Sequence, residues 1–271
     1  MKNKIKLGGI ILAFIICFST FFISMFDIIN WKQDSEKIQT QIKKIQEKTP
    51  IRENIKNENV EIIEQKEEIP ETNPYWGYLN LSLINVDFYD LKEVNKDVAG
   101  WIQVNGTNIN YPYVKTNDNK YYLTHSFDHS KNYAGWVFLD YRNNIDLTHK
   151  NNIIYAHGRE DKTMFGTLKK IFTNGWLNNT DNHVIKISTE NENTLWQVFS
   201  VYHIPATSDY LKINFKNDND FVTFANMLLQ RSMYNFNTTI NETDKILTLS
   251  TCYNDYERVV LHAKLIKKET K

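Results

Sequence analysis

The sequence predicts a mostly β protein, built either as a sandwich or as a closed barrel. Its 271 residues contain a series of short runs rich in Val, Ile, Tyr, Phe and Trp, bounded by turn-forming residues. Many short strands at this spacing are typical of all-β sandwiches and barrels. One amphipathic helical stretch interrupts the series of predicted strands. A long apolar stretch near the N-terminus precedes the whole series. Formal net charge is zero, which leaves no bulk electrostatic argument for nucleic acid as a partner.

The N-terminus has the pattern of a membrane anchor. Lys2, Lys4 and Lys6 precede an uncharged stretch, residues 7–26, and roughly 20 apolar residues span a bilayer as a helix. The alternative is a cleaved signal peptide, but these have a shorter apolar core and a small-residue cleavage site, and none is convincing here. Because basic flanks stay in the cytoplasm, we expect residues 1–30 to form a cytoplasmic tip and a single-pass anchor in the cell membrane, with the remainder extracellular.

Residues 31–74 form a polar segment between the anchor and the domain. The segment is rich in Lys, Glu, Gln and Asn, and Ile38, Ile42 and Ile45 recur at helical spacing before Pro50. We expect a solvated, partly helical stalk, so that a chain starting at residue 75 would be soluble and active. The alternative is a helix that packs onto the domain or dimerises.

The compact domain is predicted to occupy residues 75–271. One or two short helices are expected between Leu79 and Val94, and the first hairpin turns at Asn105-Gly106, which is a strong hairpin signal. The runs predicted as strands are Trp101–Val104, Ile109–Val114, Gly135–Asp140, Asn152–Ala156, Val184–Ile187, Trp196–Tyr202, Lys245–Thr251 and Val259–Leu265.

One helix is predicted between the strand that ends near Tyr202 and the strand that leads to Cys252. Its apolar residues follow the i, i+3, i+4, i+7, i+8 spacing of a single helix face. They are Phe221, Phe224, Ala225, Leu228 and Leu229. The helix is therefore an insertion in an otherwise β domain.

Cys252 is the only cysteine outside the predicted membrane helix, in which Cys17 is expected to be an inert apolar residue. A lone exported thiol has no disulfide partner in its own chain. It is therefore either an intermolecular link or a reactive group, and the residues described next favour a reactive group.

Arg258 is predicted to face Cys252 across the last hairpin. If the strands pair symmetrically about Asp255, the two residues are cross-strand neighbours, with side-chain roots about 5 Å apart. A guanidinium there stabilises a thiolate, and also an oxyanion formed when the sulfur attacks a carbonyl. Taken alone, an arginine at this position is more often an ordinary surface residue.

His157 is the candidate acid and base. It ends an apolar run and precedes the polar segment 158–162, and functional groups are commonly displayed where strands end. A histidine can take the proton of a thiol and protonate a leaving amine near neutral pH. The alternative is a structural histidine.

The other histidines are weaker candidates. His125 and His129 are four residues apart, as metal ligands on a helix can be, but no third ligand is positioned nearby, so neither a metal nor another cofactor is expected. His262 alternates with Val260 and Lys264 on the last strand. We expect it to face solvent or to lie near the site without a catalytic role.

Taken together, these motifs resemble the sortases, membrane-anchored cysteine transpeptidases of Gram-positive bacteria. The resemblance covers residues 75–271 and is carried by Thr-Leu-Ser-Thr-Cys at 248–252, by Arg258 and by Tyr-Ala-His at 155–157. Class B is indicated by the inserted helix and by four short motifs. These are Gly100-Trp101-Ile102, Asn110-Tyr111-Pro112, the segment from Gly135 to Arg142, and Met164 to Leu168.

The sequence departs from the family pattern at two places. Ala156 and Gly158 flank His157, where the family usually has Gly-His-Asn, and the loop from Cys252 to Arg258 is shorter than in many relatives. The first departure alters the surroundings of the base, and the second alters what flanks the substrate.

The resemblance implies a closed eight-stranded β-barrel with N-terminal helices and a helix inserted before the cysteine strand. It also implies that Cys252 attacks a threonine carbonyl in the C-terminal sorting signal of an exported protein, commonly Asn-Pro-x-Thr in class B. His157 would protonate the leaving group and Arg258 would support the oxyanion. An amine of peptidoglycan or a lipid II-type precursor, or a pilin lysine, would then release the thioacyl enzyme.

By the same resemblance, Ser250, Asn110 and Thr251 are expected to line the substrate groove. Two rival functions stay open. A cell-wall cysteine hydrolase or L,D-transpeptidase also exports Cys and His, but the latter has His and Gly directly before its Cys. A membrane-tethered binding or scaffold module with an inactive barrel is the other rival, and the intact Cys, His and Arg argue against it.

Overall fold

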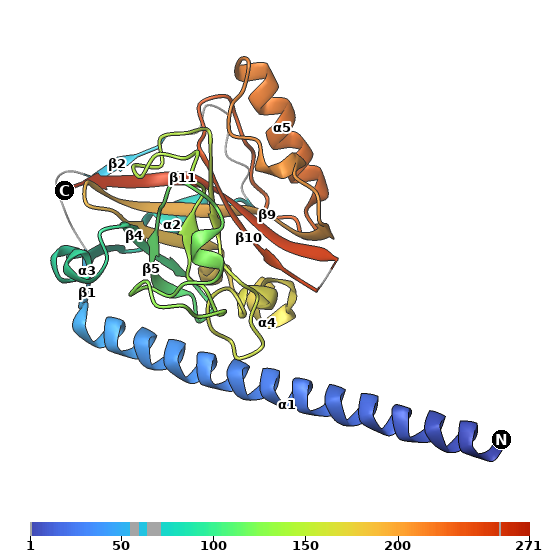
Figure 1. Ribbon diagram of the computed structural model, residues 1–271. Helices are drawn as coiled ribbons and strands as arrows, with labels where there is room; N and C mark the ends of the chain where they lie inside the picture. Colours follow the sequence, from blue (N-terminus) through green and yellow to red (C-terminus); the bar gives the residue numbers. More distant parts are fainter. Residues whose placement is uncertain (1, 55–59, 64–71, 255) are drawn as a thin grey trace.

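A long helix leads into a β-barrel in this computed structural model, which describes residues 2–54, 60–63, 72–254 and 256–271. The helix, α1 (Lys2–Lys48), runs along one side of the barrel and projects well beyond it at its N-terminal end (Figure 1). It contains one stretch long and apolar enough to cross a membrane, with a mean hydropathy of 2.4 and none of it buried. An apolar helix that is exposed all round is typical of a membrane span.

The second half of α1 packs onto the barrel, which differs from the solvated stalk expected for residues 31–74. Ile38 is fully buried, and Ile42 and Ile45 pack against the main core. The stripe of isoleucines at helical spacing is therefore a docking face, as the alternative proposed. The polar residues on the remaining faces explain why the segment has the composition of a stalk.

The chain after α1 also pairs with the domain. β1 (Ile51–Asn54) pairs antiparallel with β3 (Leu83–Val86), and β2 (Val60–Ile62) pairs antiparallel with the C-terminal strand. Two short helices, α2 (Tyr75–Leu79) and α3 (Tyr89–Val94), flank β3. α3 lies in the range where one or two short helices were expected, whereas α2 precedes that range and β3 was not predicted.

Eight strands close into a barrel, which confirms the barrel over the sandwich. The order around it is β10-β7-β6-β5-β4-β8-β9-β11, and β11 pairs back with β10. β2 joins the free edge of β11 outside this ring. The barrel strands are β4 (Val98–Val104), β5 (Asn110–Val114), β6 (Phe138–Leu139), β7 (Asn151–Tyr155), β8 (Val184–Ser188), β9 (Glu192–Pro205), β10 (Ile246–Cys252) and β11 (Glu257–Thr270).

One predicted strand, Gly135–Asp140, shrinks to the two residues of β6. Gly135 has a φ of 62°, a left-handed conformation that breaks a strand. The N–H of Trp136 donates to Tyr122 O, which lies outside the named strands. This bend takes Gly135 and Trp136 out of the strand ladder, whereas Val137 O still accepts the N–H of Val114 at 3.0 Å.

The inserted helix is α5 (Asp218–Arg231), and it begins where Asn217 accepts a hydrogen bond from the N–H of Asp220. Its apolar face packs on β9, β10 and β11 and forms a second core (Figure 1). The buried residues of this face are Phe221, Phe224, Ala225 and Leu228.

His262 lies beneath this cover, so the expected exposure to solvent is wrong, whereas the other option, a position near the site without a catalytic role, stays a prediction. Its side chain is fully buried between Tyr202 Oη and Thr248 Oγ1, each 2.8 Å from a ring nitrogen. Burial lowers the pKa of His262 to about 3. Alternation along a strand shows which residues share a face, but it does not show whether a helix covers that face.

Candidate active site

The last two strands place Cys252 opposite Arg258, which confirms the predicted hairpin register. β10 and β11 pair antiparallel, with Cys252 and Arg258 as the final partners. Side-chain roots of such partners lie about 5 Å apart. Asp255, about which the pairing was expected to be symmetric, lies outside the described residues, but the pairing itself fixes the register.

The loop between the two strands is held by Asn254. Its Oδ1 accepts the N–H groups of Tyr256 and Glu257, both at 2.8 Å, and its Nδ2 donates to Glu257 Oε2 at 2.8 Å. His203 Nδ1 lies 2.9 Å from the same carboxylate, and this hydrogen bond is the chief reason why the pKa of Glu257 is lowered. A short side chain therefore turns the hairpin immediately after the thiol.

Two parallel strands bring His157 beside Cys252. β7 and β10 are parallel, and Tyr155 pairs with Ser250. His157 lies two residues beyond Tyr155, and Cys252 lies two residues beyond Ser250. Because paired strands are about 4.8 Å apart, the segments that follow β7 and β10 leave the sheet side by side.

Gly158 permits an unusually close approach of these two chain ends. A Cβ atom built on Gly158 would lie 2.4 Å from the carbonyl oxygen of Cys252 and 3.0 Å from Thr251 Oγ1. Any side chain would therefore collide with backbone that cannot move without disturbing the thiol. The departure from Gly-His-Asn at this position is thus a steric feature of this site.

The imidazole of His157 is fixed by a backbone carbonyl. Its Nε2 lies 2.9 Å from Leu123 O, and a carbonyl only accepts, so Nε2 carries the proton and the neutral ring keeps Nδ1 as its basic nitrogen. Gly135 leaves space for the ring, since a Cβ atom there would lie 3.0 Å from His157 Cδ2. The ring is half-buried and its tautomer is set by the fold.

Cys252, His157 and Arg258 line one groove of about 660 Å³. The thiol is exposed, whereas the other two side chains are half-buried. Leu123 and Leu211 contribute apolar surface, and the other residues of the wall are partly polar and partly apolar. The volume is that of a pocket for a small ligand or a short peptide.

Of the three residues expected to bind substrate, Ser250 and Thr251 line this groove and Asn110 does not. Ser250 Oγ lies 2.9 Å from Tyr210 Oη, and burial raises the pKa of that tyrosine. The buried Thr251 Oγ1 has no hydrogen-bond partner among the described residues.

Asn110 lines a separate hollow at the turn between β4 and β5, next to Gln46 of α1. Its Oδ1 accepts the indole N–H of Trp101 at 2.7 Å, and its backbone oxygen accepts Gln46 Nε2 at 2.8 Å. Both contacts are structural, so the expected role in the groove is not supported. A match to a motif did not reveal which way this strand end faces.

A buried carboxylate behind the groove was not identified from the sequence. Asp140 is fully buried and accepts hydrogen bonds from Tyr155 Oη at 2.9 Å, Asn119 Nδ2 at 3.1 Å and Arg142 Nη2 at 2.7 Å. Arg142 Nη2 also donates to Leu211 O at 3.3 Å. Burial raises the pKa of Asp140, but the bonds from Arg142 and Tyr155 outweigh it and the pKa is lowered. One carboxylate thus ties together groove residues from three segments.

His125 and His129 are engaged by Tyr121 and do not lie on one helix. The ring of His125 stacks on Tyr121 with centroids 4.1 Å apart, and Tyr121 Oη lies 3.2 Å from His129 Nδ1. His129 itself has a φ of 63°, so the helical spacing on which a metal pair was considered does not exist.

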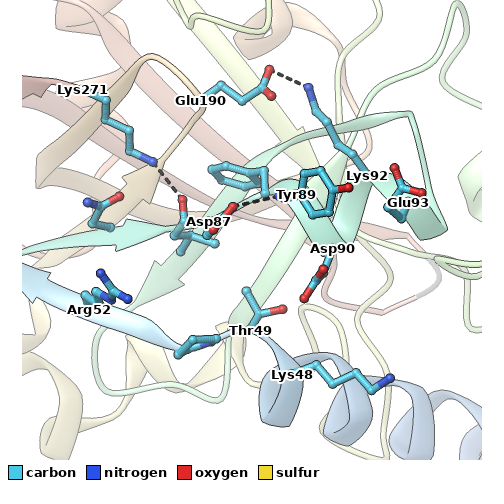
Figure 2. A pocket seen from close by; sticks show the side chains of 14 residues that line it. Lys48, Thr49, Arg52, Asp87, Tyr89, Asp90, Lys92, Glu93, Glu190 and Lys271 are labelled. Atoms are coloured by element: carbon cyan, nitrogen blue, oxygen red, sulfur yellow. Dashed lines mark hydrogen bonds and ion pairs between the residues drawn. The ribbon is translucent and has the colours of Figure 1, made fainter.

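A larger hollow, of about 800 Å³, lies between the end of α1, β1, α3 and the C-terminal residue Lys271. Figure 2 shows that both basic and acidic side chains surround it. Lys92 pairs with Glu190, and Lys271 Nζ donates to Val86 O at 3.0 Å. None of the described residues that line this hollow is a cysteine or a histidine, so the groove at Cys252 is the candidate active site.

Proteins with similar sequences and structures are found among the sortases. A family model described as the sortase domain matches residues 102–266. Sortase B of Listeria monocytogenes is 35% identical over 183 residues, which cover 66% of this chain and 74% of the relative. Among the solved structures that resemble this chain are two with a TM-score of 0.62. Clostridium perfringens sortase B is 31% identical, and the match covers 66% of this chain and 100% of that protein's chain. A Staphylococcus aureus sortase B–substrate complex is 27% identical, and the match covers 90% of this chain and 98% of that chain.

Proposed function

The chain belongs to the sortase family, class B, and on this premise we propose that it is a transpeptidase whose nucleophile is Cys252. The observation that carries the proposal is the meeting of Cys252, His157 and Arg258 in one groove, from three separate strand ends. A cysteine nucleophile requires a base and a group that stabilises the oxyanion. These three side chains supply that set.

In the first step, the Cys252 thiol gives its proton to His157, and its sulfur forms a bond to the carbonyl carbon of a threonine in a sorting signal of the Asn-Pro-x-Thr type. As the tetrahedral intermediate collapses, the C–N bond breaks and the leaving amine takes a proton from His157. The product is a thioacyl enzyme. The basic Nδ1 of His157, which the Leu123 hydrogen bond at Nε2 leaves unprotonated in the neutral ring, is the atom that takes up and returns the proton.

In the second step, an amine attacks the thioester. The new amide forms as the C–S bond breaks, and the proton of the attacking amine goes to His157. The accepting amine belongs to peptidoglycan, to a lipid II-type precursor or to a pilin lysine. Water in place of the amine gives hydrolysis as a side reaction.

Arg258 has the role of holding the substrate carbonyl and stabilising the oxyanion. Its Nη1 donates to Glu257 O at 3.2 Å, which orients the guanidinium. Because a guanidinium has five N–H donors, this bond leaves others for the substrate. Ser250 and Thr251 are proposed to contact the bound signal from the groove wall.

The proposed setting is the outer face of the cell membrane. The apolar stretch of α1 supports a single-pass anchor, and the lysines that precede it support a cytoplasmic N-terminus. The partners are then exported proteins that carry a C-terminal sorting signal.

Product analysis tests this function. The full chain in lipid nanodiscs is incubated with an Asn-Pro-x-Thr peptide and triglycine, and the products are resolved by mass spectrometry. We expect the peptide cleaved after Thr and joined to triglycine. Hydrolysis alone, even at high triglycine concentration, would favour the cell-wall hydrolase, and an uncleaved peptide would favour the scaffold module.

A further inference from the structure

The part of α1 that follows the apolar stretch is bonded to two loops of the barrel. One loop, residues 132–135, precedes β6, and the other, residues 158–166, follows His157. The helix residues that make these contacts are Trp31, Asp34 and Ser35. Both loops adjoin the candidate base, so the contacts are described one loop at a time.

The loop after His157 is tied to α1 by a buried ion pair. Arg159 and Asp161 pair at 2.7 Å with side chains only 7% and 6% exposed. Ser35 Oγ accepts from Arg159 Nη2 at 2.8 Å and donates to Asp161, while the ring of Trp31 lies 5.5 Å from the guanidinium. Burial raises the pKa of Asp161, but the bonds from Arg159 and Ser35 outweigh it and lower the pKa to about 2.

This loop folds back onto His157. The N–H of Phe165 donates to His157 O at 3.0 Å, and Gly158 forms an isolated antiparallel bridge with Met164. Met164 and Phe165 are fully buried. The loop therefore fixes the backbone on which the imidazole is carried.

The loop before β6 is tied to α1 by Asp34. Its Oδ2 accepts the N–H of Tyr133 at 3.1 Å, and its backbone oxygen accepts Asn132 Nδ2 at 3.1 Å. Asn132 O in turn accepts the N–H of Gly135 at 3.0 Å. Gly135 is the residue that lies against the His157 ring, so the second loop limits where the ring can move.

We propose that residues 31–35 of α1 clamp these two loops and thereby position the His157 imidazole for proton transfer. The membrane anchor is then more than a tether, because the same helix holds the base. Asp34 and Ser35 are positioning residues, since neither lines the groove that holds Cys252. The inference rests on the proposed role of His157.

The clamp makes a specific kinetic prediction. Misplacing a reacting group by about 1 Å can cost on the order of a hundredfold in rate, whereas the groove that binds the peptide would be unchanged. Loss of the clamp should therefore lower kcat and leave KM unaltered. A purely structural role would lower the melting temperature without this separation of kcat from KM.

The test compares three variants of the full chain in nanodiscs. Asp34→Ala/Ser35→Ala removes the side-chain hydrogen bonds of the clamp. Asp34→Asn keeps an oxygen that accepts the Tyr133 N–H, and Gln46→Ala removes a contact between α1 and β5. We expect the double variant to lose about tenfold in kcat, and the other two to stay close to the parent. An unchanged kcat in the double variant, or an equal loss in Gln46→Ala, overturns the clamp. If the double variant does not fold, Asp34→Ala alone is judged in the same way.

Hydrogen exchange separates the clamp from the proposed function. The Phe165 amide should exchange faster in the double variant than in the parent or in Gln46→Ala, whether or not the chain cleaves peptides. A parent that neither cleaves nor acylates shows that the proposed function is wrong, while exchange still judges the clamp. Unchanged exchange at Phe165 overturns the clamp on its own.

Discussion

Single residues determine how closely the proposed nucleophile and base approach. Gly158 has no side chain where a Cβ atom would be 2.4 Å from Cys252 O, and Gly135 has none where one would press on Tyr122 O and on the His157 ring. A glycine at such a point is required by the space available. In the sequence, Gly158 stands out only as a departure from a family pattern. A contact between two strand ends that are far apart in the chain leaves no local sequence motif.

Gly158→Ala should therefore be damaging despite its small size. Forcing a methyl group into a packed site typically costs about 1–3 kcal/mol, and here the strain falls on the residue that carries the thiol. We expect a lower melting temperature and a large loss of peptide cleavage. Gly77→Ala is the matched control, because nothing lies within 4 Å of a Cβ atom there. A Gly158→Ala variant as active and stable as Gly77→Ala would contradict this account.

Arg258→Ala should lower the rate of acylation while the fold is kept. Loss of one oxyanion donor typically lowers kcat by about 10²–10³, and Arg258 lies on a hairpin held by Asn254 independently of its guanidinium. His157→Ala should cause a loss of similar size. Arg52→Ala, on the exposed strand β1, serves as the control. Near-normal acylation by Arg258→Ala would show that pairing across the hairpin has no catalytic meaning.

At the level of elements, the pairing within the last hairpin could be predicted from the sequence, whereas the helix that covers the neighbouring face of the sheet could not be placed. The register of Cys252 with Arg258 follows from a short loop of turn formers. α1 docks through three isoleucines, but the segment around them is so polar that its composition predicted a solvated stalk. His262 lies on the face that Val260 shares, but α5 closes that face from elsewhere in the chain.

Because α5 buries His262 in its neutral form, stability should fall with acid. The pKa of His262 is lowered to about 3 in the folded protein, against about 6.5 in an unfolded chain. Protonation below pH 6.5 thus favours the unfolded state, and stability that is complete above pH 6.5 is lost as the pH falls toward 3. The loss should reach at most about 3 kcal/mol by pH 4.

Urea unfolding at pH 7 and pH 4 checks this linkage. His262→Gln keeps hydrogen-bonding atoms between Tyr202 and Thr248 but does not titrate. The variant should be less stable than the parent at pH 7 and should lose less stability on acidification. Equal acid sensitivity of parent and variant would assign the effect to other groups, such as the buried ion pair of Arg159 and Asp161.

At the level of the whole molecule, the apolar stretch and the part of the chain that docks on the barrel belong to one continuous helix. α1 runs unbroken across residue 30, the predicted boundary between anchor and stalk. The clamp residue Asp34 lies about 12 Å along the helix beyond Phe26, at ~1.5 Å per residue. The division into residues 1–30, 31–74 and 75–271 stays a prediction, and its middle part contributes packing to the last.

A chain that starts at residue 75 should accordingly be less stable than one that starts at residue 31. The shorter chain loses the buried Ile38, the packing of Ile42 and Ile45, and the strands β1 and β2. Burying one isoleucine contributes about 1.5–3 kcal/mol, so the difference should exceed ~3 kcal/mol. Thermal unfolding of the two chains checks this difference. Equal melting temperatures would support the hypothesis that residues 31–74 form a solvated stalk.

The central claim is that Cys252 becomes acylated by a sorting-signal peptide. Intact-mass spectrometry of the full chain in nanodiscs, after incubation with an Asn-Pro-x-Thr peptide, measures this directly. The account predicts one added acyl fragment ending at Thr, removable by hydroxylamine and absent from Cys252→Ala. An adduct that persists in Cys252→Ala, or the lack of any adduct when the peptide is cleaved, would contradict it.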